Sequence, residues 1–277
     1  YLWWYMDALS ADGRHGITLI ALIGSVFSPY YAWTRRRGDC DPRDHCALNV
    51  ALYGADTRRW TMTERGRAAL RQAPDRLDLG PSTLHWTGDC LVVDVDEVAA
   101  PLPSRVRGQV RIYPAAITRL DFQLDAAGRH RWWPIAPVAR VEVAFEQPDL
   151  RWAGTGYLDT NSGAEPLALG FKRWDWSRAD LKDGTAILYD TEGRGGHAST
   201  LALRIDPQGR IEAFPGPPRV RLPTSRVWRI ARGTRCDRGF TPRIDRTLED
   251  TPFYARSVVR TRLLEREVSA VHESLNL

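Results

Sequence analysis

The feature that most constrains the fold is a long series of short, strand-like segments separated by turn residues. Residues 138–145 alternate apolar and polar side chains, which is the period of a half-buried strand. Residues 147–149 (Gln-Pro-Asp) are a turn signal, and residues 151–159 predict a returning strand. Similar segments and turns follow one another over most of the chain. This pattern predicts an all-β protein, either a sandwich or a barrel.

The length of the chain, 277 residues, suits two domains better than one core. Because the strand pattern restarts near residue 165, we expect a first β-domain of residues 1–165 and a second of residues 166–277. Residues 16–33 are rich in β-branched and aromatic side chains and predict one long strand or two strands. Residues 62–72 predict a helix, although Gly66 interrupts it.

The chain carries a net charge of +5, and only two of its 39 basic residues are lysines, Lys172 and Lys182. A compositional bias of the genome explains such an arginine excess, and so does attraction to anionic lipid headgroups. No basic run is longer than residues 35–37 and no nucleic-acid-binding motif is present, so we expect no nucleic-acid partner. The longest apolar run, residues 17–27, is too short to span a bilayer. The chain begins inside an apolar strand, so we expect its native N-terminus, with any targeting segment, to lie upstream.

Tryptophan and cysteine each limit the possible functions. Eleven tryptophans fit a well-packed core, and they also fit a cavity walled by flat apolar rings. The segment from Cys40 to Cys46 includes His45 and has residue types that bind metals, but its spacing matches no common zinc motif. We therefore expect no metal and free thiols in a reducing compartment, with Cys90 and Cys236 as the other two cysteines.

Two short pairs, His130-x-Trp132 and Tyr157-x-Asp159, are the candidate site. Residues i and i+2 of a strand share a face, and a hairpin could bring both pairs to the same end. Together they would supply a proton donor, groups that hold a water molecule, and a π-surface for a cation. The structural alternative is a core histidine packed beside a tryptophan, with a tyrosine anchoring a strand and an aspartate capping a turn. Spacing alone leaves both interpretations open.

Two further motifs have a structural interpretation. Residues 192–196 (Glu-Gly-Arg-Gly-Gly) are glycine-rich, but they join two predicted strands, whereas a phosphate loop needs a following helix. His272 and Ser274 share a strand face, but the sequence does not place an aspartate beside them to complete a catalytic triad.

Several stretches resemble the carotenoid 1,2-hydratase family, also called hydroxyneurosporene synthase, of carotenoid-making bacteria. The similarity covers nearly the whole chain, and its runs of eight to ten residues are specific. The stretches that carry it are residues 1–5 (YLWWY), 24–33 (GSVFSPYYAW), 45–54 (HCALNVALYG), 62–67 (MTERGR), 174–178 (WDWSR), 248–257 (LEDTPFYARS) and 271–275 (VHESL).

The resemblance implies a fold of two lipocalin-like antiparallel β-barrels packed against each other. It also implies cofactor-independent addition of water to the terminal C1=C2 bond of acyclic carotenoids such as neurosporene and lycopene. The catalytic residues proposed for the family correspond here to His130, Trp132, Tyr157 and Asp159. We expect Asp159 to donate the proton, in a barrel lined with tryptophan where desolvation raises its pKa. We expect Trp132 to face the developing cation, Tyr157 to orient the water or the carboxyl group, and Asp159 or His130 to accept the proton of the water.

The expected substrate also implies a partner. A carotenoid lies in a bilayer, so we expect a cytoplasmic protein bound peripherally to the inner or photosynthetic membrane through a basic, aromatic face. Two alternatives stay open: a lipocalin-type protein that binds carotenoid without chemistry, and a cyclase or isomerase of the same two-barrel group. The mass of the product would separate hydration from both.

Overall fold

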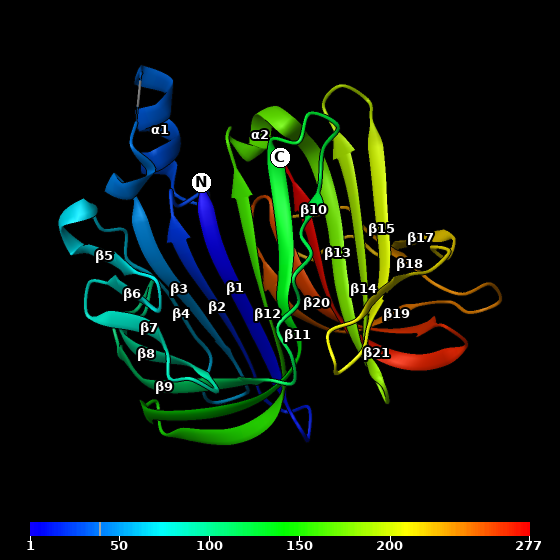
Figure 1. Cartoon of the computed structure of the whole chain (residues 1–277), viewed down its shortest axis with the longest axis horizontal. Coiled ribbons are helices and arrows are strands. Elements are labelled where there is room, and N and C mark those ends of the chain that lie inside the picture. The colour runs from blue at the N-terminus through cyan, green and yellow to red at the C-terminus, as the bar shows by residue number, and fades with distance from the viewer. Residues whose placement is uncertain (39) are drawn as a thin grey trace. The chain divides into compact units, whose positions relative to one another are not determined.

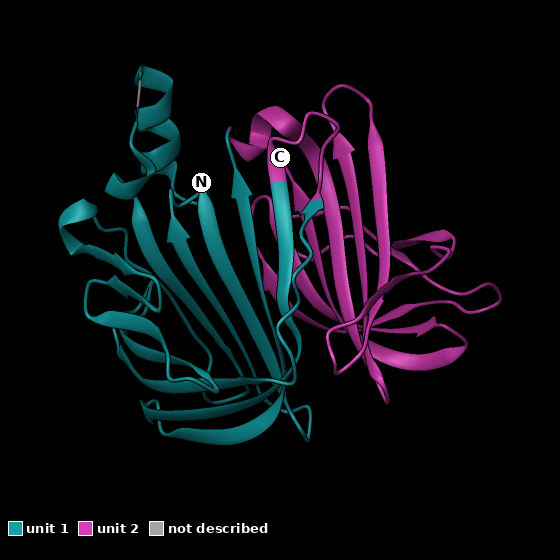
Figure 2. Ribbon diagram, in the orientation of Figure 1, with its two compact units in different colours: residues 1–122, 131–164 teal, residues 123–130, 165–277 magenta. Residues whose placement is uncertain are grey.

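The structure is a computed structural model that describes residues 1–38 and 40–277, and it is built almost entirely of β-strands (Figure 1). The chain forms two compact units (Figure 2). Unit 1 comprises residues 1–122 and 131–164, and unit 2 comprises residues 123–130 and 165–277. The predicted all-β fold is confirmed, whereas the predicted division into domains at residue 165 stays a prediction.

Unit 1 is built on a curled, 12-stranded sheet (Figure 1). Strand β1 pairs with β2, which follows it directly in the sequence, and with β12, which lies at the other end of the unit's sequence. In spatial order the strands are β4 (Arg59–Met62), β3 (Cys46–Tyr53), β2 (Gly16–Ile23), β1 (Leu2–Ser10), β12 (Leu150–Gly163), β11 (His130–Gln147), β9 (Arg105–Pro114), β8 (Leu91–Val98), β7 (Ser82–Trp86), β6 (Arg76–Leu79) and β5 (Leu70–Ala73), with β10 (Phe122–Gln123) pairing with β11.

The two faces of this sheet carry different side chains at β1 and β12. Met6 and Leu158 lie opposite each other in the register and belong to the apolar core, together with residues such as Leu48 and Val141. Burial of each such side chain contributes about 1.5–3 kcal/mol. Since successive side chains of a strand alternate between faces, the neighbours of Leu158 point away from this core. Tyr157 and Asp159 are those neighbours.

Unit 2 contains a seven-stranded sheet and a two-stranded ribbon. The sheet consists, in spatial order, of β16 (Ile211–Ala213), β15 (Ala198–Ile205), β14 (Gly184–Gly193), β13 (Phe171–Leu181), β21 (Arg266–Asn276), β20 (Tyr254–Leu263) and β19 (Arg243–Asp250). The ribbon consists of β17 (Arg219–Leu222) and β18 (Arg232–Arg235), and the short helix α2 (Leu167–Gly170) precedes β13.

Buried polar contacts hold the ribbon of unit 2 against its sheet. The Gly233 N–H donates to Oδ1 of Asp175 at 3.2 Å, and Ser274 donates its hydroxyl to the same oxygen. His272 Nε2 lies 2.7 Å from the Gly233 carbonyl, to which it donates. Burial raises the pKa of Asp175 to about 6 and lowers that of His272 to about 4. His272 therefore joins β21 to β18, and Ser274 joins β21 to β13.

Two predictions of secondary structure were wrong, and both concern segments of unit 1. β2 ends at Ile23, and helix α1 (Pro29–Arg37) replaces the predicted strand. The reason is an N-cap signal: the Ser28 hydroxyl accepts from the N–H groups of Tyr30 and Tyr31, and proline occupies the first helical position.

The helix predicted at residues 62–72 is not formed. β4 ends at Met62, a single 3₁₀ turn η2 (Arg67–Ala69) follows, and Leu70 begins β5. The backbone N–H groups of this stretch are used elsewhere, since Arg65 forms a β-bridge with Cys46 and β5 pairs with β6. Tertiary pairing therefore overrides the helical propensity.

Candidate active site

Trp132, Tyr157 and Asp159 form one hydrogen-bonded cluster in unit 1. The Trp132 Nε1–H donates to Oδ2 of Asp159 at 2.7 Å, and the Tyr157 hydroxyl donates to the same oxygen, also at 2.7 Å. Trp132 and Tyr157 are fully buried, and Asp159 is only 4 % exposed. The expected shared face of Tyr157 and Asp159 is thus present, and β11 brings the tryptophan to it.

Tyr157 remains a neutral hydrogen-bond donor over the whole physiological range. Burial raises the pKa of its phenol well above 10, and the neighbouring Asp159 raises it further, through its charge and through the hydrogen bond itself. A phenol that cannot ionise keeps its proton directed at the carboxyl group.

His130 begins β11, two residues before Trp132, and belongs to unit 2. Its imidazole is fully buried, lies 4.7 Å from the ring of Phe171 (centroid to centroid), and has Nε2 3.3 Å from Oε1 of Glu165. Burial lowers the pKa of His130, against the opposing effect of Glu165. The imidazole is therefore neutral at neutral pH and able to accept a proton.

A second phenol–carboxyl pair, Tyr5 and Asp7, lies beside the pair of Tyr157 and Asp159 and was not predicted from the sequence. Tyr5 and Asp7 on β1 pair in register with Asp159 and Tyr157 on β12, respectively. The Tyr5 hydroxyl donates to Oδ2 of Asp7 at 2.8 Å, and the rings of Tyr5 and Tyr157 meet edge to face at 6.1 Å. The signal was available, because Tyr5-x-Asp7 has the same spacing as Tyr157-x-Asp159.

Two cavities of unit 1 lie near this cluster. A largely apolar cavity of about 350 Å³ is lined by Leu158 and by Trp4, Trp86 and Trp133, and so lies on the core side of the sheet. The carboxyl group was expected inside such a tryptophan-lined barrel, but Asp159 faces the other side. The face that a strand turns inward depends on how the sheet curls, which the alternation of residues does not specify.

The second cavity, of about 260 Å³, is lined by Trp132 of the cluster but not by Tyr157 or Asp159. Trp132 and Trp133 line it together with polar side chains, among them Arg119, Thr160 and Ser162. Polar groups around a space of this size are suited to ordered water.

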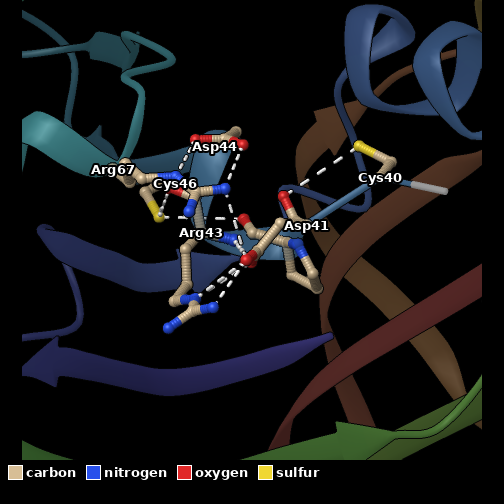
Figure 3. Close-up of polar contacts among 7 residues, drawn as sticks. Cys40, Asp41, Arg43, Asp44, Cys46 and Arg67 are labelled. Carbon is tan, nitrogen blue, oxygen red and sulfur yellow. Dashed lines mark hydrogen bonds and ion pairs between the residues drawn. The ribbon is translucent and has the colours of Figure 1, made fainter.

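The segment after α1, from Cys40 to Cys46, is held by a network of ion pairs (Figure 3). Arg43 and Arg67 neutralise the carboxylates of Asp41 and Asp44, each at 2.6 Å, and the Cys46 thiol lies 3.3 Å from the Arg43 carbonyl. All four cysteines are free thiols. In residues 1–38 and 40–277, no group of three or more His, Cys, Asp or Glu side chains could hold a metal ion.

A family model described as carotenoid hydratase CrtC matches residues 19–277. This chain belongs to the carotenoid hydratase family. It is 62 % identical over 277 residues to an acyclic carotenoid 1,2-hydratase of Thiocapsa roseopersicina, an alignment that covers 100 % of the chain and 68 % of that relative. It is 51 % identical over 280 residues to the enzyme of the same name from Rubrivivax gelatinosus, covering 100 % of the chain and 69 % of the relative.

Solved structures support the fold of this carotenoid hydratase. Kievitone hydratase from Nectria haematococca has a TM-score of 0.62 at 10 % identity, covering 99 % of this chain and 88 % of that one. CghA has a TM-score of 0.59 at 12 % identity, with coverage of 100 % and 88 %. The predicted family is confirmed, and the four predicted site residues stay a prediction.

Proposed function

We propose that this protein adds water to the terminal C1=C2 bond of acyclic carotenoids, the reaction named for its relatives, and that it does so without a cofactor. The observation that carries the proposal is the buried cluster of Trp132, Tyr157 and Asp159. A carboxyl group beside an aromatic face, removed from solvent, is the arrangement that protonation of an unactivated alkene requires.

Asp159 is the proton donor in this proposal. The proton goes to C2, because the positive charge then rests on the tertiary carbon C1. Trp132 and Tyr157 both donate to Oδ2 of Asp159. A carboxyl oxygen that carries a proton accepts hydrogen bonds poorly, so the proton to be transferred sits on Oδ1. Burial favours this neutral form, because the carboxylate would lose its hydration.

The remaining residues stabilise the cation and deliver water. Attraction of a cation to the indole of Trp132 is worth on the order of 2 kcal/mol in a dry site, which is about one and a half decades of rate. Most of the acceleration then comes from positioning and from a preorganised, water-poor environment. Water attacks C1, and its proton passes to the ionised Asp159 or to the neutral imidazole of His130. Tyr157 holds the orientation of the carboxyl group.

Incubation with lycopene, followed by mass spectrometry of the extracted carotenoid, tests this function. A hydratase adds the mass of one water, a cyclase or isomerase leaves the mass unchanged, and a carrier protein retains unaltered lycopene. The variant D159N should bind lycopene, as seen in the absorption spectrum of the bound polyene, and form no hydrated product. Turnover by a folded D159N protein would overturn the assignment of Asp159.

We also propose peripheral binding to an anionic membrane, through helix α1. In the described part of the chain no helix is long and apolar enough to span a bilayer. Tyr30, Trp33 and Arg37 have the i, i+3, i+7 spacing of one helical face, and Tyr30 and Trp33 are 71 % and 52 % exposed. The Arg37 guanidinium lies 3.6 Å above the Trp33 ring. The buried Tyr31 anchors the helix, so this face offers indole, phenol and arginine to phospholipid headgroups.

Vesicle flotation tests this surface. The triple variant W33A/R36Q/R37Q should float with vesicles of phosphatidylcholine and phosphatidylglycerol much less than the unmodified protein does. A matched control is R226Q/W228A/R229Q, because Trp228 is also 52 % exposed and also lies between exposed arginines. Equal losses in both triple variants, or flotation insensitive to salt, would contradict an assignment to α1.

A further inference from the structure

The apolar cavity of about 350 Å³ in unit 1 has no role in the reaction described above. Its walls belong to the core of the sheet, and Leu84, Leu91 and Leu158 are among the buried residues that line it. Protein interiors are close-packed and contain few spaces larger than a water molecule. A cavity of this volume among core side chains instead has the size of a small-molecule site.

This cavity is separate from the acid of the proposed reaction. Leu158 lines it, whereas the next residue of β12, Asp159, projects from the opposite face of the strand. The described residues that line the cavity do not include Asp159, and they do not include Trp132 or Tyr157, which donate hydrogen bonds to it. A molecule bound in the cavity therefore lies across the sheet from the carboxyl group and does not receive its proton.

The lining suits a flat, apolar and uncharged molecule. Trp4 and Trp86 line the cavity and are half-buried, so part of each indole is available to a ligand. Of the described residues that line the cavity, Asp75 and Arg76 carry the charges, and both are exposed where β5 turns into β6. The Arg76 guanidinium is also paired with Asp78, at 2.7 Å. The inner walls therefore select a hydrocarbon over an anionic headgroup.

The turn between β5 and β6 forms the exposed side of the cavity. Gln72, Ala73 and Pro74 line the cavity here and are exposed to solvent. The backbone N–H of Trp86 donates to the carbonyl of Asp75 at 2.9 Å, so the turn is tied to β7. The entrance is thus held at a fixed place on the sheet.

The volume of the cavity limits how much of a ligand it holds. An engineered apolar cavity of about 150 Å³ binds benzene, and by that ratio a cavity of 350 Å³ holds roughly fourteen carbon atoms. This is enough for one end of a long polyene but not for the whole molecule. The rest of the chain would leave through the exposed side.

We propose that this cavity is a second, non-catalytic binding site, which holds one end of a linear conjugated polyene. A conjugated chain is flat and uncharged, and so it matches the indole rings and the apolar walls. The inference concerns binding alone. It does not depend on Asp159 being the acid, and a protein that binds a polyene here without hydrating it would leave the inference intact.

Binding of diphenylhexatriene, a rod-shaped and uncharged polyene whose fluorescence rises in apolar surroundings, tests the site. The unmodified protein should bind this probe in detergent-free buffer, and lycopene should displace it. D159N should bind the probe with unchanged affinity, because the carboxyl group lies on the other face of the sheet. Absence of binding, loss of affinity in D159N, or displacement by oleic acid and not by lycopene would each overturn the proposal.

Two exposed alanines provide a matched pair of variants. A73W places an indole at the entrance and should weaken binding about tenfold or more, which corresponds to losing the burial of about two carbon atoms. A68W is the control, because Ala68 is also exposed but does not line the cavity, and its affinity should stay within about twofold of normal. L84F, which narrows the interior, should act like A73W. Equal affinities in folded A73W and A68W would contradict the site.

Photolabelling of the unmodified protein gives a result that needs no substitution. A linear alkane that carries a diazirine attaches, after illumination, to the side chains against which it lies, and peptide mass spectrometry locates the label. Attachment within β6 to β8 that diphenylhexatriene suppresses is the expected result. Attachment confined to other segments would overturn the proposal.

Discussion

Trp132 holds Asp159 with its edge: the indole N–H donates to Oδ2 over 2.7 Å. In the proposed mechanism, the tryptophan therefore orients the acid in addition to offering a ring face to the cation. Phe122 packs against the indole at 5.5 Å between ring centroids and limits its freedom to tilt. In the proposed mechanism one side chain serves the acid and the cation together, so the indole would fix the angle between the carboxyl group and the bound alkene.

The variant W132F separates these two roles. Phenylalanine keeps an aromatic face but cannot donate to Asp159. Loss of a hydrogen bond to a charged or buried carboxyl group is worth about 1.5–3 kcal/mol, so turnover should fall about ten- to a hundredfold while lycopene still binds. The matched control is W133F, since the Trp133 Nε1–H donates at 3.1 Å to the backbone carbonyl of Thr118. W133F should change stability and leave turnover close to normal. Equal turnover in W132F and the unmodified enzyme would leave Trp132 as a ring face alone.

The features that the sequence predicted depend on local strand geometry. Those that it left open depend on the curl of the sheet and on pairing between distant strands. That Tyr157 and Asp159 share a face follows from the period of a strand, and their hydrogen bond agrees with it. Which face of the sheet is the interior depends on its curl, so the sequence did not place Leu158 inside and Asp159 on the other side. Tyr5-x-Asp7 was visible as a spacing, but its relation to Tyr157 depends on pairing between strands about 150 residues apart. Helix α1 was missed although Ser28 and Pro29 are an ordinary N-terminal signal, because the aromatic residues around them favoured a strand.

Removal of the Tyr157 hydroxyl should weaken the acid without unfolding the protein. In Y157F, Asp159 keeps the donor from Trp132 and loses the one from the phenol. Turnover should fall about tenfold, in line with a single hydrogen bond of about 1.4 kcal/mol. The phenol of Tyr157 stays protonated far into the alkaline range. Any fall in activity that the unmodified enzyme shows above pH 9 therefore has another cause and should also be present in Y157F. A pH–rate profile of both proteins checks the two statements together.

Gly170 leaves the space that the imidazole of His130 occupies. A methyl group at this position would come within 2.5 Å of Nε2 and 3.1 Å of Cδ2 of His130. The variant G170A should therefore displace the ring from Glu165, and a shift of about 1 Å in a catalytic group lowers turnover up to about a hundredfold. G195A is the control, since a methyl at Gly195 meets nothing within 4 Å. Normal turnover in G170A would argue that the position of His130 does not matter for hydration.

In unit 2, His272 and Asp175 should have opposite effects on stability as the pH falls. His272 has its pKa lowered to about 4, so between its ordinary pKa of about 6.5 and 4 the unfolded chain binds a proton that the folded chain does not. Stability is lost over this range. Asp175 has its pKa raised to about 6, so between about 6 and 3.8 the folded chain binds the extra proton and stability is gained. Each effect amounts to about 3 kcal/mol at most, and the two largely offset each other between pH 6 and 4.

Substitution of His272 removes the loss of stability at low pH and leaves the gain that comes from Asp175. At pH 7.5, H272N should be less stable than the unmodified protein by about 1 kcal/mol, because it weakens the hydrogen bond to the Gly233 carbonyl. The difference should shrink on acidification and change sign near pH 5, because only the unmodified protein loses stability as His272 is protonated in its unfolded chain. Urea denaturation at pH 7.5, 6, 5 and 4 measures the difference. The control is H197N, whose imidazole is exposed, so this substitution should change stability only slightly. A difference for H272N that stays constant over this range would mean that His272 is protonated in the folded protein.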